Sequence, residues 1–373
     1  MMPRAETLVE FRGVEKRYTA GARAAVTRLD LTVERGEFLT LLGPSGSGKT
    51  TTLMMLAGFE IPSAGEIRLN GQSLADRPPY KRNMGVVFQN YALFPHMSVA
   101  ENLAFPLGVR GIRGADAKAK VDAALTLVRL DGLGHRRPDA LSGGQRQRVA
   151  LARALIFEPD LVLMDEPLGA LDRQLREHLQ SEIKRIQRAL GLTILYVTHD
   201  QSEALTMSDR IAVFADGTVQ QVGSPEQIYE YPSNAFVAGF VGENNMLAGT
   251  VVARQDEQCT IRLPGGQVVH ATATGAIAAG DDVIAAIRPE HVETGAGQPA
   301  RCNMLDTRVD ELVYHGDHSR IRAGLDGGGS LVIRTPSQSG VALSDRLPVG
   351  WCADRCFAFP AAGITGASMG NRP

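Results

Sequence analysis

The chain reads Phe38-Leu-Thr-Leu-Leu-Gly-Pro-Ser-Gly-Ser-Gly-Lys-Thr50 close to its start. The second part of this stretch has the spacing G-x-x-x-x-G-K-[ST], which is typical of a phosphate-binding loop. The apolar run Phe38–Leu42 before the loop indicates a buried strand, and Thr51–Ala57 after it reads as a helix. In that order, the N–H groups of the loop and the positive end of the helix converge on a phosphate. An ordinary Gly/Ser turn would not need this context, so the stretch predicts a nucleotide-phosphate site.

The residues of this loop have separate expected roles. Lys49 is expected to reach the β- and γ-phosphates of a nucleotide, and the Thr50 hydroxyl is expected to ligate Mg²⁺. The residues from which we expect nucleotide contacts are Gly43, Pro44, Ser45, Gly46, Ser47, Gly48, Lys49, Thr50 and Thr51. A nucleoside triphosphate and Mg²⁺ are therefore the expected ligands.

A second, acidic element is expected to complete the site. The run Leu161-Val-Leu-Met-Asp165-Glu166 ends an apolar strand in two carboxylates. We expect Asp165 to hold Mg²⁺ through its water shell, and Glu166 to orient or deprotonate the attacking water. The alternative is that two acids merely close a strand in a turn, and the nearby phosphate loop makes that the weaker interpretation.

The pattern around these motifs indicates an α/β domain. Nearly continuous apolar runs, Leu161–Met164 and Thr193–Val197, suit parallel strands that are covered on both faces. Between them, apolar residues recur every three or four positions, as on one face of a long helix: Leu171, Leu175, Leu179, Ile183, Ile186 and Leu190. Strand, helix and strand in this order imply a parallel sheet with right-handed crossovers. In such sheets the ligand lies at the carboxyl ends of the strands.

Composition excludes several classes of protein. The 373 residues carry 39 Lys+Arg against 41 Asp+Glu, a net charge of -2, which removes the electrostatic signature of a nucleic-acid binder. Four cysteines are too few for a dense disulfide framework, so a reducing compartment is expected. The sequence has no apolar stretch of membrane-spanning length, and its start lacks the apolar core of a secretory signal. We expect a soluble chain with no nucleic-acid partner.

Residue usage divides the chain in two. All six lysines lie at or before Lys184, whereas all four cysteines and the one tryptophan lie after position 255. At about 100–200 residues per domain, the length also implies more than one domain. We expect a nucleotide-binding domain over residues 1–240, a β-rich domain over residues 241–360 and a flexible tail over residues 361–373. Short alternating runs separated by Gly, Asp and Pro in the second region indicate a small β-barrel or sandwich.

A second glycine-containing stretch, Leu141-Ser-Gly-Gly-Gln145, precedes the apolar-periodic run Arg146–Leu155. The run reads as a helix whose positive end faces a backbone nest at the two glycines, which is another phosphate-binding arrangement. One nucleotide has no evident use for two such sites in one domain. If two copies pack head to tail about a two-fold axis, each copy closes the other's nucleotide, so we expect a homodimer. The residues expected to contact the partner's nucleotide are Ser142, Gly143, Gly144 and Gln145.

Together, the two glycine-containing stretches resemble those of the ATP-binding subunit of ABC transporters, which are P-loop NTPases. The resemblance implies that the nucleotide is ATP, that the reaction is ATP hydrolysis, and that further residues at matching positions have roles. Tyr18 would stack on adenine, and Asp172 would signal between the protomers. Gln89 would sense the metal and the attacking water and touch the membrane subunits, and His199 would contact the γ-phosphate. Taken alone, Tyr18 equally suits packing on a strand, and a histidine after a strand is usually a surface residue.

These implied roles complete the list of expected site residues. The expected catalytic residues are Glu166, His199 and Gln89, and the expected metal ligands are Thr50, Gln89 and Asp165. The resemblance also extends to the second domain. Prokaryotic import ATPases of the sugar, iron, sulfate and polyamine group carry C-terminal regulatory β-barrels of the OB-like, TOBE type, and Ala286-Ile-Arg-Pro-Glu-His291 is similar to their recurring segment.

Within that group, Asn90–Met97, Thr198–Arg210 and Phe240–Asn245 look most like spermidine/putrescine importers. Ferric iron, thiamine, sulfate or a sugar stay open as solutes, because the ATPase subunit carries solute identity only by ancestry. The resemblance implies a homodimer bound to two transmembrane permease subunits at the cytoplasmic face of the inner membrane. An extracytoplasmic solute-binding protein would deliver the solute.

Three other interpretations compete with this one. A soluble ABC ATPase of translation or DNA maintenance would carry two cassettes or a long coiled coil, and the chain has one Leu-Ser-Gly-Gly-Gln and no sustained heptads. An export ATPase would lack the β-rich extension or be fused to membrane spans. A metal site at Cys352–Cys356 or His315–His318 would need a second matching pair, and none is convincing.

Overall fold

The structure is a computed structural model that describes residues 6–19, 21, 23–169, 171–295, 302–337 and 340–361. The chain divides into two compact units, Met1–Gln227 and Ile228–Pro373. Helix α7 (Pro225–Glu230) crosses the division. The expected domain limits at residues 240 and 360 stay predictions, and residues 362–373 of the expected tail lie outside the described part of the chain.

The first unit alternates strands and helices, as the sequence predicts. Its described strands are β1 (Thr7–Lys16), β2 (Val26–Glu34), β3 (Phe38–Leu42), β4 (Ala64–Leu69), β5 (Gln72–Ser73), β6 (Met84–Val87), β7 (Leu161–Asp165), β8 (Ile194–Thr198), β9 (Arg210–Ala215) and β10 (Thr218–Gly223). Its described helices are α1 (Lys49–Ala57), α2 (Val99–Val109), α3 (Gly114–Leu127), α4 (Gly143–Leu155), α5 (Arg173–Leu190) and α6 (Gln201–Met207). Every residue of β3, β7 and β8 is buried, in agreement with their continuous apolar sequences.

The central sheet has the strand order β10-β9-β3-β8-β7-β6. All neighbouring pairs except β10 with β9 are parallel, which confirms the predicted α/β fold. Leu42 pairs with Thr198, and Asp165 pairs with Val197. The strands β3, β8 and β7 therefore end side by side, so the loops that follow them start at one edge of the sheet. This edge is where parallel sheets bind ligands.

A separate antiparallel sheet, β2-β1-β4-β5, covers α1 and one side of the central sheet. Its strands and α1 share one core that includes Phe11, Leu31, Leu53 and Leu163, all with at most 5% of their surface exposed. This core fixes the helix that starts directly after the phosphate loop.

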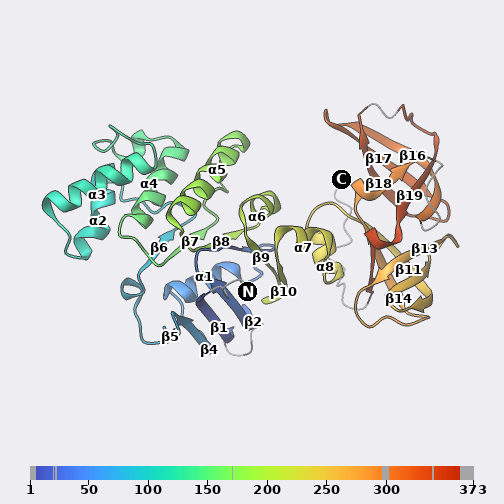
Figure 1. The fold of residues 1–373 in the computed structure, drawn as a ribbon, viewed down its shortest axis with the longest axis horizontal. Coiled ribbons are helices and arrows are strands. Elements are labelled where there is room, and N and C mark those ends of the chain that lie inside the picture. The colour runs from blue at the N-terminus through green and yellow to red at the C-terminus, as the bar shows by residue number, and fades with distance from the viewer. Residues whose placement is uncertain are drawn as a thin grey trace. The chain divides into compact units, whose positions relative to one another are not determined.

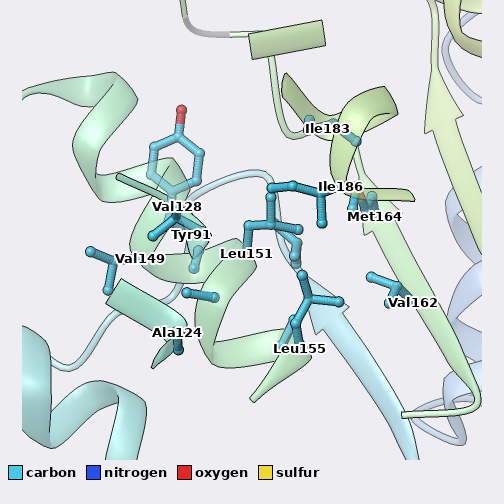
Figure 2. Packing of buried hydrophobic residues seen from close by; sticks show 14 of the residues in the cluster. Tyr91, Ala124, Val128, Val149, Leu151, Leu155, Val162, Met164, Ile183 and Ile186 are labelled. Carbon is cyan, nitrogen blue, oxygen red and sulfur yellow. The ribbon is translucent and has the colours of Figure 1, made fainter. Parts of the chain in front are cut away.

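Helices α2, α3 and α4 lie together beyond the β6 edge of the sheet (Figure 1). Their apolar sides join β7 and α5 in a second core. Figure 2 shows Leu151 and Leu155 of α4 among Met164 of β7 and Ile186 of α5, all of them buried. The shared core means that α4, which carries the second glycine stretch at its start, is packed directly against α5.

The second unit is almost entirely β-structure. It contains α8 (Ala235–Phe240) and the described strands β11 (Asn245–Gln255), β12 (Gln258–Arg262), β13 (Val268–Ala273), β14 (Asp282–Ile287), β15 (Glu293–Thr294), β16 (Cys302–Tyr314), β17 (His318–Leu325), β18 (Ser330–Pro336), β19 (Arg346–Cys352) and β20 (Cys356–Pro360). Strands β11-β12-β13-β20-β14 form a closed barrel, and β15-β19-β16-β17-β18 form a five-stranded sheet. Both contribute to one core around Trp351, which confirms the predicted small-barrel architecture.

Two further observations concern the described residues as a whole. None of their helices is long and apolar enough to cross a membrane. None of their His, Cys, Asp and Glu side chains form a group of three or more that could hold a metal ion, and this includes the neighbourhood of His315 and His318. The rings of those two histidines stack at 5.0 Å between centroids.

Candidate nucleotide-binding and hydrolysis site

The candidate site lies at the carboxyl ends of four neighbouring strands. The Gly43–Thr50 loop follows β3, Glu166 follows β7, His199 follows β8, and Gln89 comes two residues after β6. The strand order β3-β8-β7-β6 therefore brings segments that are up to 156 residues apart, from Gly43 to His199, to one edge of the sheet. Gln89 is exposed there.

The glycines of the loop are required by its close contacts. A Cβ atom on Gly43 would collide with the carbonyl oxygen of Phe214, and one on Gly48 would collide with that of Ala25. Gly48 also has a φ of +101° and Gly46 a φ of +78°, a region that L-residues seldom adopt. At Gly46 a Cβ would meet no atom within 4 Å, so glycine is favoured there by its backbone conformation alone.

The start of α1 fits an anion. Its N-cap is Gly48, which offers no side-chain hydrogen bond to the first-turn N–H groups. By contrast, side chains cap α2, α4, α5 and α6, from Ser98, Ser142, Asp172 and Asp200 respectively. Uncapped N–H groups and the positive end of the helix dipole favour a phosphate at this position.

Lys49 is a buried cation with only 4% of its surface exposed. Its Nζ donates hydrogen bonds to the carbonyl oxygens of Gly43 at 2.8 Å and Pro44 at 2.9 Å. Burial lowers the pKa of the Lys49 ammonium, although Glu166 and Asp165 oppose this. A buried ammonium held by neutral carbonyls stands to gain from an anionic partner, as a nucleotide phosphate would be.

Thr50 and Asp165 meet as the sequence predicts for two metal ligands. The Thr50 hydroxyl donates a hydrogen bond of 2.9 Å to Asp165 Oδ1. Burial raises the pKa of the Asp165 carboxyl, the bond from Thr50 and the nearby Lys49 lower it, and Glu166 raises it further. A hydroxyl and a carboxylate are the hard oxygen ligands that Mg²⁺ prefers, and the ion keeps several waters as its other ligands. These residues therefore fit Mg²⁺.

Glu166 and His199 lie next to each other at this edge of the sheet. His199 Nδ1 lies 3.2 Å from Glu166 Oε1, and the exposed fractions of the two side chains are 54% and 20%. Glu166 has a φ of +43°, which is strained for a residue with a Cβ. Its backbone N–H donates to Val197 O at 3.0 Å, which fixes it against β8. The arrangement presents a carboxylate that can accept a proton from water beside an imidazole that can orient it.

The second glycine stretch differs in detail from the predicted nest. Gly143 and Gly144 are the first residues of α4, so the helix begins three residues earlier than expected. A capping box is the reason, because Gln145 N–H donates to Ser142 Oγ at 3.3 Å and Ser142 N–H donates to Gln145 Oε1 at 3.0 Å. The positive end of α4 is nevertheless at the predicted residues.

Asp172 and Tyr18 lie at separate places in the unit. Asp172 caps α5 by accepting a hydrogen bond from Leu175 N–H at 3.0 Å. Tyr18 is 60% exposed, its hydroxyl is 3.4 Å from Thr51 Oγ1, and Lys16 Nζ lies 4.9 Å from its ring centroid. Tyr18 is thus next to the phosphate loop. Among the described residues, no hydrogen bond or ion pair joins Ser142–Gln145 or Asp172 to that loop within one chain.

The sequence interpretation missed Arg176, Asp200 and Glu203. Arg176 bonds to Asp200, the residue after His199, and Asp200 and Glu203 in turn belong to a buried hydrogen-bond network. A weak signal was present, because Arg176 stands four residues after Asp172 in the first turns of a helix, where a cation is unfavourable.

Comparison with known proteins agrees with the site. The family described as ABC transporter matches residues 26–169, and the family described as TOBE domain matches residues 285–359. Two solved structures share the fold of the first unit. One is cbiO1 from Clostridium perfringens, described as part of the ABC transporter complex cbiONQ, which has a TM-score of 0.55 and 27% identity over 60% of this chain and 90% of its own. The dimeric bacterial ABC transporter cassette MJ0796 has a TM-score of 0.53 and 32% identity, over 58% of this chain and 99% of its own.

Together with the sheet order and the phosphate loop, these matches define an ABC-type ATPase. Curated relatives narrow the class. A spermidine/putrescine import ATP-binding protein of Rubrobacter xylanophilus is 47% identical over 94% of this chain and 93% of its own length, and one of Pseudomonas fluorescens is 44% identical over 95% and 96%. The chain belongs to the PotA family of import ATP-binding proteins.

Proposed function

We propose that the chain hydrolyses ATP to drive the import of polyamines, spermidine and putrescine, across a membrane. The observation that carries the proposal is the meeting of Lys49, Thr50 and Asp165 with the Glu166–His199 pair at one sheet edge. The printed names of the relatives supply the solute, because several of them are spermidine/putrescine import proteins over nearly the whole chain. These two supports are independent of each other.

In this proposal the phosphates of ATP lie along Gly43–Thr51, and Tyr18 stacks on the adenine. Lys49 exchanges its bonds to neutral carbonyls for bonds to the β- and γ-phosphates. Thr50 and Asp165 would hold Mg²⁺, with Gln89 as a further contact. When bound, the ion would neutralise charge on the phosphates.

Glu166 is the proposed general base. It would take the proton of a water molecule positioned for attack on the γ-phosphate, while His199 contacts that phosphate and keeps the carboxylate oriented. Gln89 is the third proposed catalytic residue, at the end of β6. The strained φ of Glu166 supports an active role, because such strain is concentrated at functional sites.

Each complete site would form between two copies of the chain. Gly43–Thr51 of one protomer and Ser142–Gln145 of the other would enclose one ATP, with Asp172 of the second protomer nearby. The positive end of α4 supports this, because among the described residues no hydrogen bond joins Ser142–Gln145 to the phosphate loop of the same chain. The homodimer would bind two permease subunits at the inner face of the membrane, and a solute-binding protein outside would supply the polyamine.

Residues 1–240 are the proposed ATP-binding domain and residues 241–360 the proposed regulatory domain. The barrel and the five-stranded sheet of the second unit support a regulatory role only by likeness to the TOBE domain that matches them. The ligand or partner of this domain is not part of the proposal.

The test is uptake of labelled spermidine by cells whose own copy of the gene is deleted. We expect the wild-type chain to restore uptake, and Glu166→Gln to abolish it while the purified variant still binds ATP. Removal of a catalytic carboxylate should lower hydrolysis by at least about a hundredfold. Glu177→Gln, an exposed carboxylate paired with Arg173, is the matched control and should retain both activities.

Two results would contradict the proposal separately. If Glu166→Gln hydrolysed ATP at a near-normal rate, Glu166 would not be the catalytic base. If the wild-type chain hydrolysed ATP in the transporter complex and restored uptake of another solute but not of spermidine, the polyamine assignment would be wrong and the ATPase assignment would stand.

A further inference from the structure

One guanidinium connects two loops of the candidate site. Arg176, in the second turn of α5, donates from Nη1 to Asp200 Oδ2 at 2.8 Å and from Nη2 to the backbone carbonyl of Leu171 at 3.0 Å. Asp200 directly follows His199, and Leu171 directly precedes Asp172. The side chain is 28% exposed, so it is partly shielded from competing water. Arg176 therefore touches the loop after β8 and the loop before α5 at the same time.

The loop after β8 is firmly held where Arg176 contacts it. Asp200 Oδ1 accepts hydrogen bonds from Ser202 N–H at 2.8 Å and Glu203 N–H at 3.2 Å, which caps α6. Asp200 N–H donates to Thr198 Oγ1 at 3.0 Å, and that hydroxyl donates to Glu203 Oε2 at 2.7 Å. His199 lies between Thr198 and Asp200, which these bonds hold in place. A shift of Asp200 would therefore move the imidazole ring that faces Glu166.

The loop before α5 is in contact with the start of α4. A Cβ on Gly143 would lie 3.2 Å from Leu171 Cδ2, and one on Gly144 would lie 3.0 Å from Leu175 Cδ1. The two glycines are thus closely packed on leucines at either side of Asp172. A displacement of Leu171 would change the surface against which the start of α4 rests.

Helix stability does not explain Arg176 at this position. The positive end of the helix dipole gives no stabilisation to a cation near the start of a helix, so the dipole does not account for Arg176. Its Nε is also buried, has no hydrogen-bond partner among the described residues, and lies 4.0 Å from Glu203 Oε1. Glu203 is therefore a second carboxylate within ion-pair distance of the guanidinium.

We propose that Arg176 is a positioning residue that couples the His199 loop to the Leu171–Asp172 loop and the start of α4 in the same protomer. The proposal rests on the proposed function, in which His199 and Glu166 serve the protomer's own ATP and Asp172 and Ser142–Gln145 serve the partner's ATP. Arg176 then relays the state of one ATP site to the other. The relay acts through the one guanidinium that bonds to both Asp200 and the Leu171 carbonyl, with Glu203 close by.

The test uses mixed dimers of the full chain, assembled with the permeases from two differently tagged copies. The first copy carries Glu166→Gln, which silences its own site, so all remaining hydrolysis occurs at the site built on Glu166 of the second, wild-type copy. The first copy's own site is already silent, so any effect of adding Arg176→Met to that copy on the remaining hydrolysis acts through the elements that this copy lends to its partner. We expect hydrolysis at the remaining site to fall about tenfold relative to Glu166→Gln alone.

Two variants in the first copy and one homodimer measurement control this result. Arg173→Met makes the same chemical change on the exposed first residue of α5, whose side chain is 92% exposed, and should leave the remaining hydrolysis unchanged. Arg176→Lys keeps the charge but cannot bond to two partners in a fork, so it should restore at most part of the loss. In homodimers, Arg176→Met should lower the Hill coefficient for ATP, while ATP binding to the monomer is unchanged.

Each remaining outcome overturns the relay. Unchanged hydrolysis in the mixed dimer would confine Arg176 to its own site. If Arg176→Met weakened ATP binding to the monomer as much as it lowered hydrolysis, Arg176 would have a structural role alone. The same would follow if neither Arg176 variant assembled into the complex. The proposed function is checked first and separately, because the homodimer of Glu166→Gln must be inactive before mixed dimers are compared.

Discussion

Glu166 illustrates how the backbone of a single residue can direct two neighbouring carboxylates to different partners. Its φ of +43° turns the side chain out of the direction of β7, so that Asp165 points to Thr50 and Glu166 to His199. Two adjacent carboxylates thus have different partners. Such strain costs about 1–3 kcal/mol and persists only where the surroundings enforce it, here through the bond from Glu166 N–H to Val197 O.

Ser142 is expected to matter for hydrolysis beyond its role as a helix cap. Ser142→Ala should remove the bond to Gln145 N–H and lower the free energy of unfolding by about 1 kcal/mol. It should also reduce hydrolysis strongly, because the hydroxyl would face the partner's ATP, while the monomer still binds ATP. Turnover and equilibrium binding of a fluorescent ATP analogue measure the two effects.

The chain contains a matched control for this change. Ser98 caps α2 through the same box, with bonds to and from Glu101. Ser98→Ala should lower stability by a similar amount and leave hydrolysis near normal. Equal loss of hydrolysis in both variants would mean that Ser142 acts only by stabilising its helix.

At the scale of elements, the sequence predicted those strands and loops that a short stretch of residues determines by itself. The apolar runs identified β3, β7 and β8, and the glycine spacing identified the loop before α1. The start of α4 was misjudged by three residues, because two glycines suggested a loop and the capping box was not considered. Arg176 could not be found from periodicity, since its partner Asp200 lies 24 residues further along the chain, on a loop that only the folded sheet brings close.

Helix α6 and strand β8 share a buried carboxyl group with a predictable pH effect. Glu203 is 3% exposed, and burial raises its pKa above the ordinary 4.5, against the hydrogen bonds from Thr198 and Tyr196. The folded protein therefore holds this proton more tightly than the unfolded chain does. It follows that this group lowers the free energy of unfolding as pH rises above about 4.5.

Glu203→Gln cannot ionise and should lack this contribution. We expect the stability of the variant relative to wild type to increase as pH rises through that window, and to level off at higher pH. Urea denaturation at a series of pH values measures the difference. Glu177→Gln, at an exposed site, should show no such rise, and a flat difference for Glu203→Gln would contradict the raised pKa.

At the scale of the whole molecule, two cysteines of the second unit can report whether that unit is folded. Cys356 lies on β20 with 0% of its surface exposed, and burial raises its pKa to about 12. Cys352, four residues earlier, is exposed. Only the thiolate reacts with alkylating reagents, so the two residues should differ widely in the native protein.

We expect iodoacetamide at pH 8 to modify Cys352 in the native chain and to leave Cys356 unmodified until the chain is unfolded in urea. Trypsin cuts after Arg355 and separates the two cysteines, so mass spectrometry can quantify each one. Comparable rates for both residues in the native chain would mean that the barrel opens readily. Cys259, which is also buried, should follow Cys356.

The strand that carries Cys356 also sets the order in which the protein can be completed during synthesis. Strand β20 closes the barrel by pairing with β13 on one side and β14 on the other, although both were made much earlier. In the central sheet of the first unit, by contrast, β10 is the last strand to be synthesised. On the ribosome, the ATPase unit can therefore fold before β20 is made. Until then, β11 to β14 form an open barrel in which β13 and β14 each lack a neighbour. A chain interrupted at this point would expose these unpaired strand edges to other proteins.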